Sequence, residues 1–216
     1  MTTYVIVHGR IPLCKRLFDL VLAIPGFVLL SPLLGMVCLA ILLFDGPPIF
    51  FTQQRPGYLC KIFKPIKFRT MNSRRDAQGN LLPDEQRVSS LGRWLRATSV
   101  DELPQLINVI RGEMSLVGPR PLLVQYLKLY SPEQARRQSV LPGITGWAQV
   151  NGRNALRWQE RFQMDVWYVD HWSFALDIKI LALSLWKAFK REGINPPGQL
   201  TMGEFMGNDT NEDTEN

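Results

Sequence analysis

The sequence has few of the residues on which many enzymes build their chemistry. Only two histidines, His8 and His171, occur in 216 residues, so neither histidine-based catalysis nor a histidine-rich metal site is expected. The three cysteines are few and odd in number, which argues against a disulfide framework and favours a reducing compartment. No Walker loop and no GxGxxG, HExxH or GxSxG motif is present.

Charge is absent from residues 20–44, an apolar run of 25 residues. As a helix, this run is long enough to reach across the ~30 Å hydrocarbon core of a membrane. The pair Ser31-Pro32 lies in its middle, and a proline there removes a backbone donor and kinks a helix. A hydroxyl beside the proline could bond a freed carbonyl oxygen.

Basic residues flank both ends of this run, from Arg10 to Arg16 before it and from Arg55 to Arg69 after it. The positive-inside rule then places both ends on the cytoplasmic side. A bent helix that enters and leaves by the same leaflet satisfies the rule at both ends. A kinked helix that crosses the membrane remains open as the alternative.

Acidic residues are scarce outside the C-terminal end. Residues 1–203 contain all 25 lysines and arginines but 14 of the 19 acids, so they carry a formal charge of +11. A basic body favours anionic partners such as phospholipid head groups, nucleotides or nucleic acid. The polar, acidic end of the chain is predicted to be disordered.

The remaining pattern predicts an α+β fold that is mostly helical with short strands. Strands are expected at 49–52 and 62–71, helices at 89–97, 101–111, 155–170 and 174–190, a helix start at Ser131, and a loop at 141–146. Tryptophans mixed with basic residues on the last two helices suit a membrane interface, and an ordinary core face is the alternative. We expect a membrane segment at 1–46, a cytosolic catalytic domain at 47–200 and a tail at 201–216.

Two adjacent acids, Asp101 and Glu102, lie where a helix is expected to begin, because Pro104 is tolerated only in a first turn. One interpretation is purely structural: Ser99 and Glu102 would form a capping box, and the acids would stabilise the helix dipole. The functional interpretation is that the dipole keeps Asp101 ionised. An ionised carboxylate can bind a divalent cation or attack phosphorus.

Phosphate chemistry also requires cations, and the candidates are Lys67, Arg69, Arg96, Arg120 and Arg153. Any single arginine is more often a solvated surface charge. Arg120 and Arg153 stand out because both lie in loops rich in glycine or proline. Pro119 and Pro121 restrict the backbone on either side of Arg120, and a rigid guanidinium suits bidentate phosphate binding.

With these residues in view, the chain resembles the small monotopic phosphoglycosyl transferases, the PglC-like bacterial sugar transferases. The matching stretches are KRLFD (15–19), SP (31–32), FTQQRPG (51–57), KFRTM (67–71), DELPQL (101–106), MSLVGPRP (114–121) and PGITGWAQVNGRN (142–154). The resemblance covers about residues 15–193. The absence of a large N-terminal extension indicates the minimal form of this family rather than its multi-span form.

The resemblance implies a fold and a reaction. The membrane element would be a re-entrant helix-break-helix turned at Ser31 and Pro32, in the bacterial inner membrane, with the active site on the cytoplasmic face. Asp101 would contact Mg²⁺ and attack the sugar-bound phosphate of a UDP-sugar, releasing UMP. Undecaprenyl phosphate would then take the phosphosugar from Asp101. Glu102 would be a second catalytic acid.

The resemblance also implies which residues bind the nucleotide and its phosphates. These are Lys67, Arg96, Pro119, Arg120, Pro121 and Arg153. The identity of the sugar is not encoded in the motifs, and a homodimer in the membrane is compatible with the apolar helices.

Three other functions are weighed against this one. A membrane-bound glycosyltransferase that releases UDP would also use acids, Mg²⁺ and arginines, but the acids here are adjacent at a helix start rather than an Asp-x-Asp pair on a loop. A non-enzymatic adaptor that binds anionic lipid would not need Asp101. A nucleic-acid binder fits the charge, but no recognition helix or RNA-binding motif is present, so no nucleic-acid partner is expected.

Overall fold

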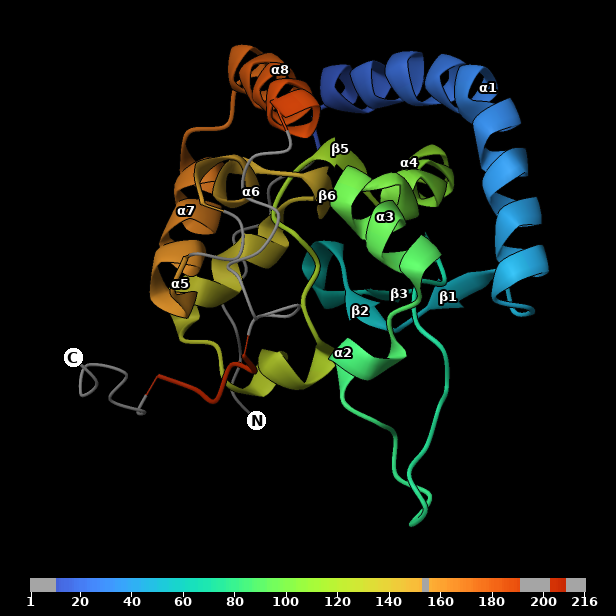
Figure 1. The fold of residues 1–216 in the computed structure, drawn as a ribbon. Coiled ribbons are helices and arrows are strands. Elements are labelled where there is room, and N and C mark those ends of the chain that lie inside the picture. The colour runs from blue at the N-terminus through green and yellow to red at the C-terminus, as the bar shows by residue number, and fades with distance from the viewer. Residues whose placement is uncertain (1–10, 153–155, 191–202, 209–216) are drawn as a thin grey trace.

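Figure 1 shows a computed structural model of the chain, which describes residues 11–152, 156–190 and 203–208. Helices dominate this fold, as the sequence predicts. The α-helices are α1 (Leu13–Phe44), α2 (Asp84–Arg87), α3 (Ser90–Thr98), α4 (Leu106–Arg111), α5 (Pro132–Ala135), α6 (Trp147–Asn151), α7 (Trp158–Asp170) and α8 (Phe174–Lys190). Four 3-10 helices join them: η1 (Tyr58–Cys60), η2 (Val100–Gln105), η3 (Val124–Lys128) and η4 (Arg136–Ser139).

The strands are short and form three separate pairs. They are β1 (Phe50–Thr52), β2 (Arg55–Pro56), β3 (Ile62–Phe63), β4 (Ile66–Phe68), β5 (Ser115–Val117) and β6 (Gly143–Thr145). Strand β1 pairs antiparallel with β4, and β2 pairs antiparallel with β3. Strands β5 and β6 are parallel, with Ser115 opposite Gly143 and Val117 opposite Thr145.

Helix α1 is one continuous helix of 32 residues that turns sharply partway along its length, wrapping two sides of the body (Figure 1). Pro32 has no N–H to donate to the carbonyl oxygen of Val28, four residues earlier. The Ser31 hydroxyl donates to this oxygen instead, at 2.7 Å. This contact is the one that the Ser31-Pro32 pair predicts, since a hydroxyl beside a proline can satisfy a freed carbonyl.

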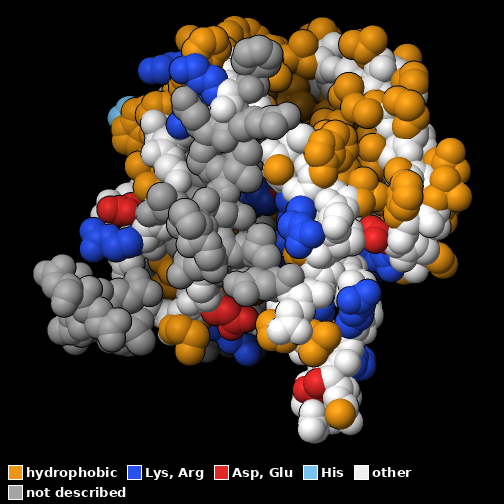
Figure 2. Space-filling view, in the orientation of Figure 1, with side chains coloured by type: hydrophobic (Ala, Val, Ile, Leu, Met, Phe, Trp, Pro, Cys, Tyr) orange, Lys and Arg blue, Asp and Glu red, His pale blue; other side chains and the backbone are white. Residues whose placement is uncertain are grey.

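The outer surface of α1 is apolar and exposed. Leu29 is 80% exposed and Phe44 78% exposed, and Figure 2 shows hydrophobic side chains gathered along the upper and right edges of the molecule, where α1 runs. Helix α1 is long and apolar enough to cross a membrane, by length and composition. Such a surface is costly in water, since each Å² of exposed apolar area costs about 25 cal/mol.

The inner face of α1 packs on the body. Ala23 belongs to a core cluster with Val109 of α4 and Val117 of β5, and Ile41 packs with Phe68 and other buried residues in a second cluster. Arg16 donates to the carbonyl oxygens of Val109 and Ile110, near the C-terminal end of α4. A cation there satisfies carbonyls that have no helical partner and opposes the helix dipole.

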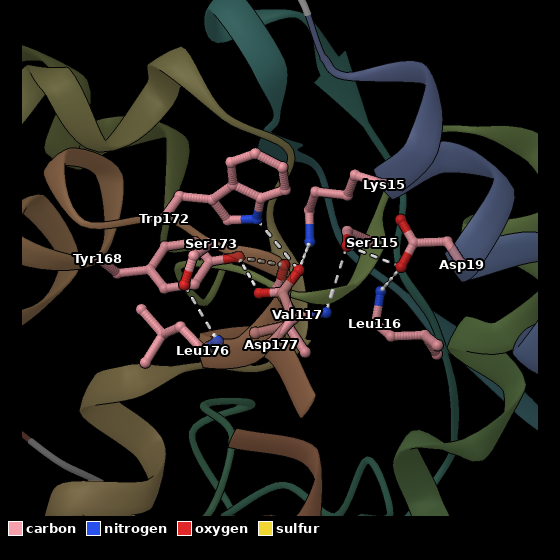
Figure 3. Close-up of polar contacts among 10 residues, drawn as sticks. All are labelled: Lys15, Asp19, Ser115, Leu116, Val117, Tyr168, Trp172, Ser173, Leu176 and Asp177. Atoms are coloured by element: carbon pink, nitrogen blue, oxygen red, sulfur yellow. Dashed lines mark hydrogen bonds and ion pairs between the residues drawn. The ribbon is translucent and has the colours of Figure 1, made fainter. Parts of the chain in front are cut away.

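A buried polar network joins the start of α1 to α8 (Figure 3). The Lys15 ammonium lies 2.6 Å from a carboxylate oxygen of Asp177, and both side chains are at most 5% exposed. Tyr168 and Trp172 also donate to Asp177, at 2.7 and 3.1 Å. Because all the donors converge on one buried carboxylate, its charge is compensated inside the protein.

A second part of this network reaches β5. The Asp19 carboxylate accepts hydrogen bonds from the Ser115 hydroxyl and from the Leu116 N–H, both at 3.0 Å. The motif KRLFD therefore attaches the membrane-type helix to the body through three of its members: Lys15, Arg16 and Asp19.

An aromatic cluster at the other end of the body includes part of the chain that the sequence assigns to a disordered tail. Phe205 is 3% exposed and packs with Tyr126, Tyr130, Trp158 and Phe162. Its N–H donates to the Tyr126 hydroxyl at 3.1 Å. The prediction of disorder is therefore wrong for residues 203–208, and residues 209–216 lie outside the described part of the chain.

Other predicted elements differ from the structure in detail. The strand predicted at 62–71 is split into β3 and β4 around Pro65, and the loop predicted at 141–146 contains β6. The helix predicted at 101–111 is divided into η2 and α4. A helix starts at Ser131 as predicted, with a capping box between Ser131 and Gln134. Helix α8 has its predicted bounds, and α3 and α7 lie within three residues of theirs.

Candidate active site

The adjacent acids lie on η2, directly after a sharp reversal of the chain. Ser99 ends α3 in the left-handed conformation with φ +57°, and Asp101 and Glu102 follow in the first turn of η2. The Ser99 side chain makes no capping hydrogen bond there. The capping box predicted for Ser99 and Glu102 is therefore not formed, and the Glu102 carboxylate is committed elsewhere.

Glu102 binds two cations. One oxygen, Oε1, accepts a hydrogen bond from Lys67 Nζ at 2.7 Å. The Arg120 guanidinium makes a bidentate contact with both oxygens of the same carboxylate, at 3.1 Å between Nη1 and Oε2 and more closely between Nη2 and Oε1. Burial would raise the pKa of Glu102, but Arg120 and Lys67 outweigh it and hold this pKa far below its ordinary value.

Asp101 has a different environment. Its residue is 9% exposed, and its carboxylate makes no hydrogen bond or ion pair with any residue that the structure describes. Burial and the neighbouring charge of Glu102 raise its pKa to about 6, against the opposing effect of Lys67, Arg120 and Arg96. With a pKa of about 6, the Asp101 carboxylate is still mostly ionised at neutral pH, although this pKa lies above the ordinary value of an aspartate.

Lys67 is positioned by β4. It lies opposite Phe51 of β1, and the N–H of the preceding residue, Ile66, donates to the side-chain oxygen of Asn108 at 2.9 Å. Asn108 is fully buried and also donates to the carbonyl oxygen of Lys64 at 3.0 Å. This side chain fastens the strand that carries Lys67 to α4, the helix that continues directly from η2.

The loop that carries Arg120 is held by backbone contacts. Gly118 donates to the carbonyl oxygen of Thr145 at 2.9 Å, and the carbonyl oxygen of Pro119 accepts from Gly143 at 3.0 Å. A Cβ on Gly118 would lie 2.2 Å from the carbonyl oxygen of Leu141, so only glycine fits there. The parallel strands β5 and β6 therefore fix the position of Pro119, Arg120 and Pro121.

The other basic residues that the sequence predicts for phosphate binding differ in their contacts. Arg96 influences the pKa of Asp101 by its charge, and its Nε donates to the Thr70 hydroxyl at 2.9 Å. Arg69 donates to the carbonyl oxygens of Asp45, Gly46 and Pro47, which follow the end of α1. Its guanidinium therefore holds the chain after α1 in place and is not directed at a phosphate site. Arg153 lies outside the described residues.

Sequence reasoning missed a buried ion pair behind the Arg120 loop. Arg137 donates to one carboxylate oxygen of Asp165 through Nε at 3.0 Å and Nη2 at 2.8 Å. The same Nη2 donates to the backbone carbonyl oxygen of Arg120 at 2.6 Å. No short motif signals this pair, because its members are 28 residues apart.

The Asp101 carboxylate is a chemically suitable ligand for a divalent cation. The described residues contain no cluster of three or more His, Cys, Asp or Glu side chains that could hold a metal ion without further ligands. Mg²⁺ commonly binds through one or two carboxylates together with water and substrate phosphates. The Asp101 carboxylate meets this requirement, whereas the Glu102 carboxylate is already paired with the side chains of Lys67 and Arg120.

Comparison with known proteins gives a consistent result. The family model described as "Bacterial sugar transferase" matches residues 11–191. The chain is 53% identical over 193 residues to "Uncharacterized sugar transferase EpsL" of Bacillus subtilis, covering 89% of this chain and 96% of that protein.

Two longer relatives carry more specific names. One is the "Undecaprenyl-phosphate glucose phosphotransferase" of Komagataeibacter xylinus, 44% identical over 79% of this chain and 35% of its own length. The other is the "UDP-glucose:undecaprenyl-phosphate glucose-1-phosphate transferase" of Escherichia coli, 40% identical over 82% of this chain and 40% of its own length. The chain spans well under half of these two proteins. Since the family model covers most of the chain, the protein belongs to the bacterial sugar transferase family.

Proposed function

We propose that this protein transfers a sugar phosphate from a UDP-sugar to undecaprenyl phosphate, as a membrane step of glycoconjugate assembly. The names of two relatives, at 44% and 40% identity, support this reaction class. The observation that carries the proposal is that the two adjacent acids have different contacts. Glu102 is bound by Lys67 and Arg120, and Asp101 beside it has a free, buried carboxylate.

Asp101 is the nucleophile in this proposal. One of its carboxylate oxygens attacks the phosphorus that bears the sugar, and a new O–P bond forms while the bond to the nucleotide phosphate breaks. The electron pair of the broken bond leaves with UMP. In the second step an oxygen of undecaprenyl phosphate attacks the same phosphorus, which frees the Asp101 carboxylate and yields a polyprenyl diphosphosugar.

The cations offset the charge of this reaction. A carboxylate that approaches a diphosphate meets strong repulsion, and positive groups fixed in advance reduce it without reorganising. Glu102 holds Lys67 and Arg120 in place before substrate arrives, and Arg96 adds a third charge near Asp101. Mg²⁺ bound by Asp101 and the substrate phosphates would supply further charge neutralisation.

Helix α1 is proposed to anchor this site at the membrane. Its exposed apolar surface and the sharp turn partway along its length suit a re-entrant element in the inner membrane, with both ends on the cytoplasmic side. The lipid phosphate would then reach Asp101 from the leaflet, and the UDP-sugar from the cytosol. Proximity would replace a search through bulk solvent.

The identity of the released nucleotide tests this function. The full chain would be incubated with a panel of UDP-sugars, Mg²⁺ and undecaprenyl phosphate, alongside Asp101→Asn. Release of UMP that depends on the lipid phosphate and is lost in Asp101→Asn is the expected result. Release of UDP would contradict the proposal and favour a glycosyltransferase that moves the sugar alone.

A further inference from the structure

The run Pro119-Arg120-Pro121 has few backbone groups with which to attach itself to the body. Two of its three residues have no N–H, so the loop depends largely on its carbonyl oxygens. The carbonyl oxygen of Pro119 accepts from the Gly143 N–H at 3.0 Å, and that of Arg120 accepts from Arg137 Nη2 at 2.6 Å. Strand β6 therefore holds the first residue of this run, and a single side chain holds the second.

The Arg137 side chain is 1% exposed and is held on several sides. Its Nε and Nη2 both donate to Oδ2 of Asp165, at 3.0 and 2.8 Å, and its Nη1 donates to the Tyr130 hydroxyl at 3.4 Å. The guanidinium also lies over the rings of Tyr130 and Phe162, with its central carbon 5.9 and 5.8 Å from the ring centres. These partners orient the planar guanidinium so that it directs a donor at Arg120.

The partners of Arg137 are themselves fixed in the body. Phe162 and Asp165 are three residues apart on α7, so they share a face of that helix. The rings of Tyr130 and Phe162 meet edge to face at 5.3 Å, and Phe205 packs against Phe162 at 5.0 Å. Arg137 therefore belongs to η4, but α7 and the aromatic cluster set its orientation.

Stability alone does not account for the pair of Arg137 and Asp165. Both residues are 2% exposed, and a buried ion pair carries a large cost of desolvation. Apolar side chains of similar volume in place of such a pair are often neutral or stabilising. They would, however, provide no donor for the carbonyl oxygen of Arg120. The contact with Arg120 is thus what the ion pair adds to the molecule.

We propose that Arg137 is a positioning residue that places Arg120 for the transfer reaction. This assignment rests on the proposed function. Arg137 holds the backbone of Arg120 and Glu102 binds its guanidinium, so this arginine is fixed at both ends before substrate arrives. A cation fixed in advance stabilises charge on a phosphate without reorganising, whereas a misplacement of about 1 Å costs up to about 100-fold in rate.

A double-mutant cycle distinguishes the positioning of Arg120 from a contribution to stability. The charge-free variant combines Arg137→Met with Asp165→Leu, so neither buried charge is left without its partner. The full chain in lipid nanodiscs receives Mg²⁺, undecaprenyl phosphate and a UDP-sugar that the wild type uses. The kcat for nucleotide release is measured for the charge-free variant with and without Arg120→Gln, and thermal unfolding shows whether each variant is folded.

Arg136→Gln is the matched control. Arg136 directly precedes Arg137 on η4 and pairs with the exposed side chains of Glu133 and Asp170, neither of which belongs to the Arg120 loop. Exposed pairs of this kind contribute little to stability. The kcat of Arg136→Gln should therefore equal that of the wild type.

We expect the charge-free variant to lower kcat about tenfold or more when Arg120 is present. In the presence of Arg120→Gln it should lower kcat about twofold at most, because the side chain that Arg137 positions is then missing. The same factor in both backgrounds, or full activity of the folded charge-free variant, would overturn the proposal. Were that variant to unfold, Arg137→Lys would replace it under the same two criteria, since a lysine keeps a cation beside Asp165 but lacks the planar fork.

Amide hydrogen exchange, measured without substrate, separates this outcome from that of the proposed function. Exchange in residues 118–122 should be faster in the charge-free variant, while α4 keeps its wild-type rate; unchanged exchange in 118–122 would overturn the proposal. Release of UDP, or of no nucleotide, would contradict the proposed function. A kcat loss that depends on Arg120 would still support the role of Arg137 in the first case, and the exchange result alone would decide it in the second.

Discussion

Lys67 Nζ lies 2.7 Å from Glu102 Oε1, so the lysine of β4 pairs with the second acid of the motif and not with the first. The Arg120 guanidinium also pairs with Glu102. The two adjacent acids therefore differ in pKa as well as in contacts: the pKa of Glu102 lies far below its ordinary value, and that of Asp101 is raised to about 6. Separate roles follow, with Glu102 organising cations and Asp101 available for reaction.

The reaction of Asp101 should depend on pH. A carboxyl group attacks phosphorus only when it has lost its proton, so the rate of UMP release should rise with pH through about 6 and then level off. The first half-reaction, measured without undecaprenyl phosphate, avoids the titration of the lipid phosphate, which has a second pKa near 6. A rate that stayed constant between pH 5 and 7.5 would contradict this assignment.

Replacement of Glu102 should move that pH profile. Its negative charge is the second cause, after burial, of the raised pKa of Asp101. In Glu102→Gln this effect disappears, while Lys67 and Arg120 still favour the ionised Asp101, so the acidic limb should shift to lower pH. The plateau rate should fall about 10- to 100-fold because the cations lose their positioning contact, a loss of the size seen for a single electrostatic catalytic group. A profile unmoved on the pH axis would argue against the coupling of the two acids.

The Arg120 loop should not tolerate a side chain at Gly118. A Cβ there would lie 2.2 Å from the carbonyl oxygen of Leu141, so Gly118→Ala must displace β5 from β6 and move Arg120. We expect at least tenfold loss of UMP release, since small displacements of catalytic groups are costly. Gly35→Ala is the control, because a Cβ at Gly35 meets no atom within 4 Å. Equal activity of the two variants would show that the loop geometry is unimportant.

The buried pair that fastens α1 should be essential for stability. Lys15→Met removes the cation from Asp177 and leaves a buried carboxylate with only Tyr168 and Trp172 as side-chain donors. Breaking a buried pair in this way typically costs about 3–5 kcal/mol. Thermal unfolding in detergent should show a midpoint several degrees lower. Lys128→Met, at an exposed position, should leave the midpoint unchanged; a similar midpoint in both variants would contradict a structural role for Lys15.

Much of the site can be predicted from the sequence because its residues lie in long motifs. The motifs name Asp101, Glu102, Lys67 and Arg120, and the structure brings these four residues together. The hydroxyl of Ser31 behaves as its position beside Pro32 predicts. These features depend on local chemistry, which a single sequence carries.

Contacts between distant segments escaped prediction. The pairing of Arg137 with Asp165 joins η4 to α7, and the buried Phe205 closes an aromatic cluster from beyond the last helix. Strand β6 lies in a stretch rich in glycine and proline, which predicts a loop. It forms a strand because it pairs with β5, and not because of its own β-propensity. The role of Arg69 also depends on where α1 ends in space.

The most direct measurement of the central claim is the mass of the protein after reaction with a UDP-sugar in the absence of undecaprenyl phosphate. The wild type should gain the mass of one phosphosugar, release UMP in equal amount, and yield a modified peptide at Asp101, while Asp101→Asn gains nothing. Addition of undecaprenyl phosphate should then remove the added mass. An unmodified protein that turns over fully once lipid is supplied, or an adduct on a residue other than Asp101, would contradict the account.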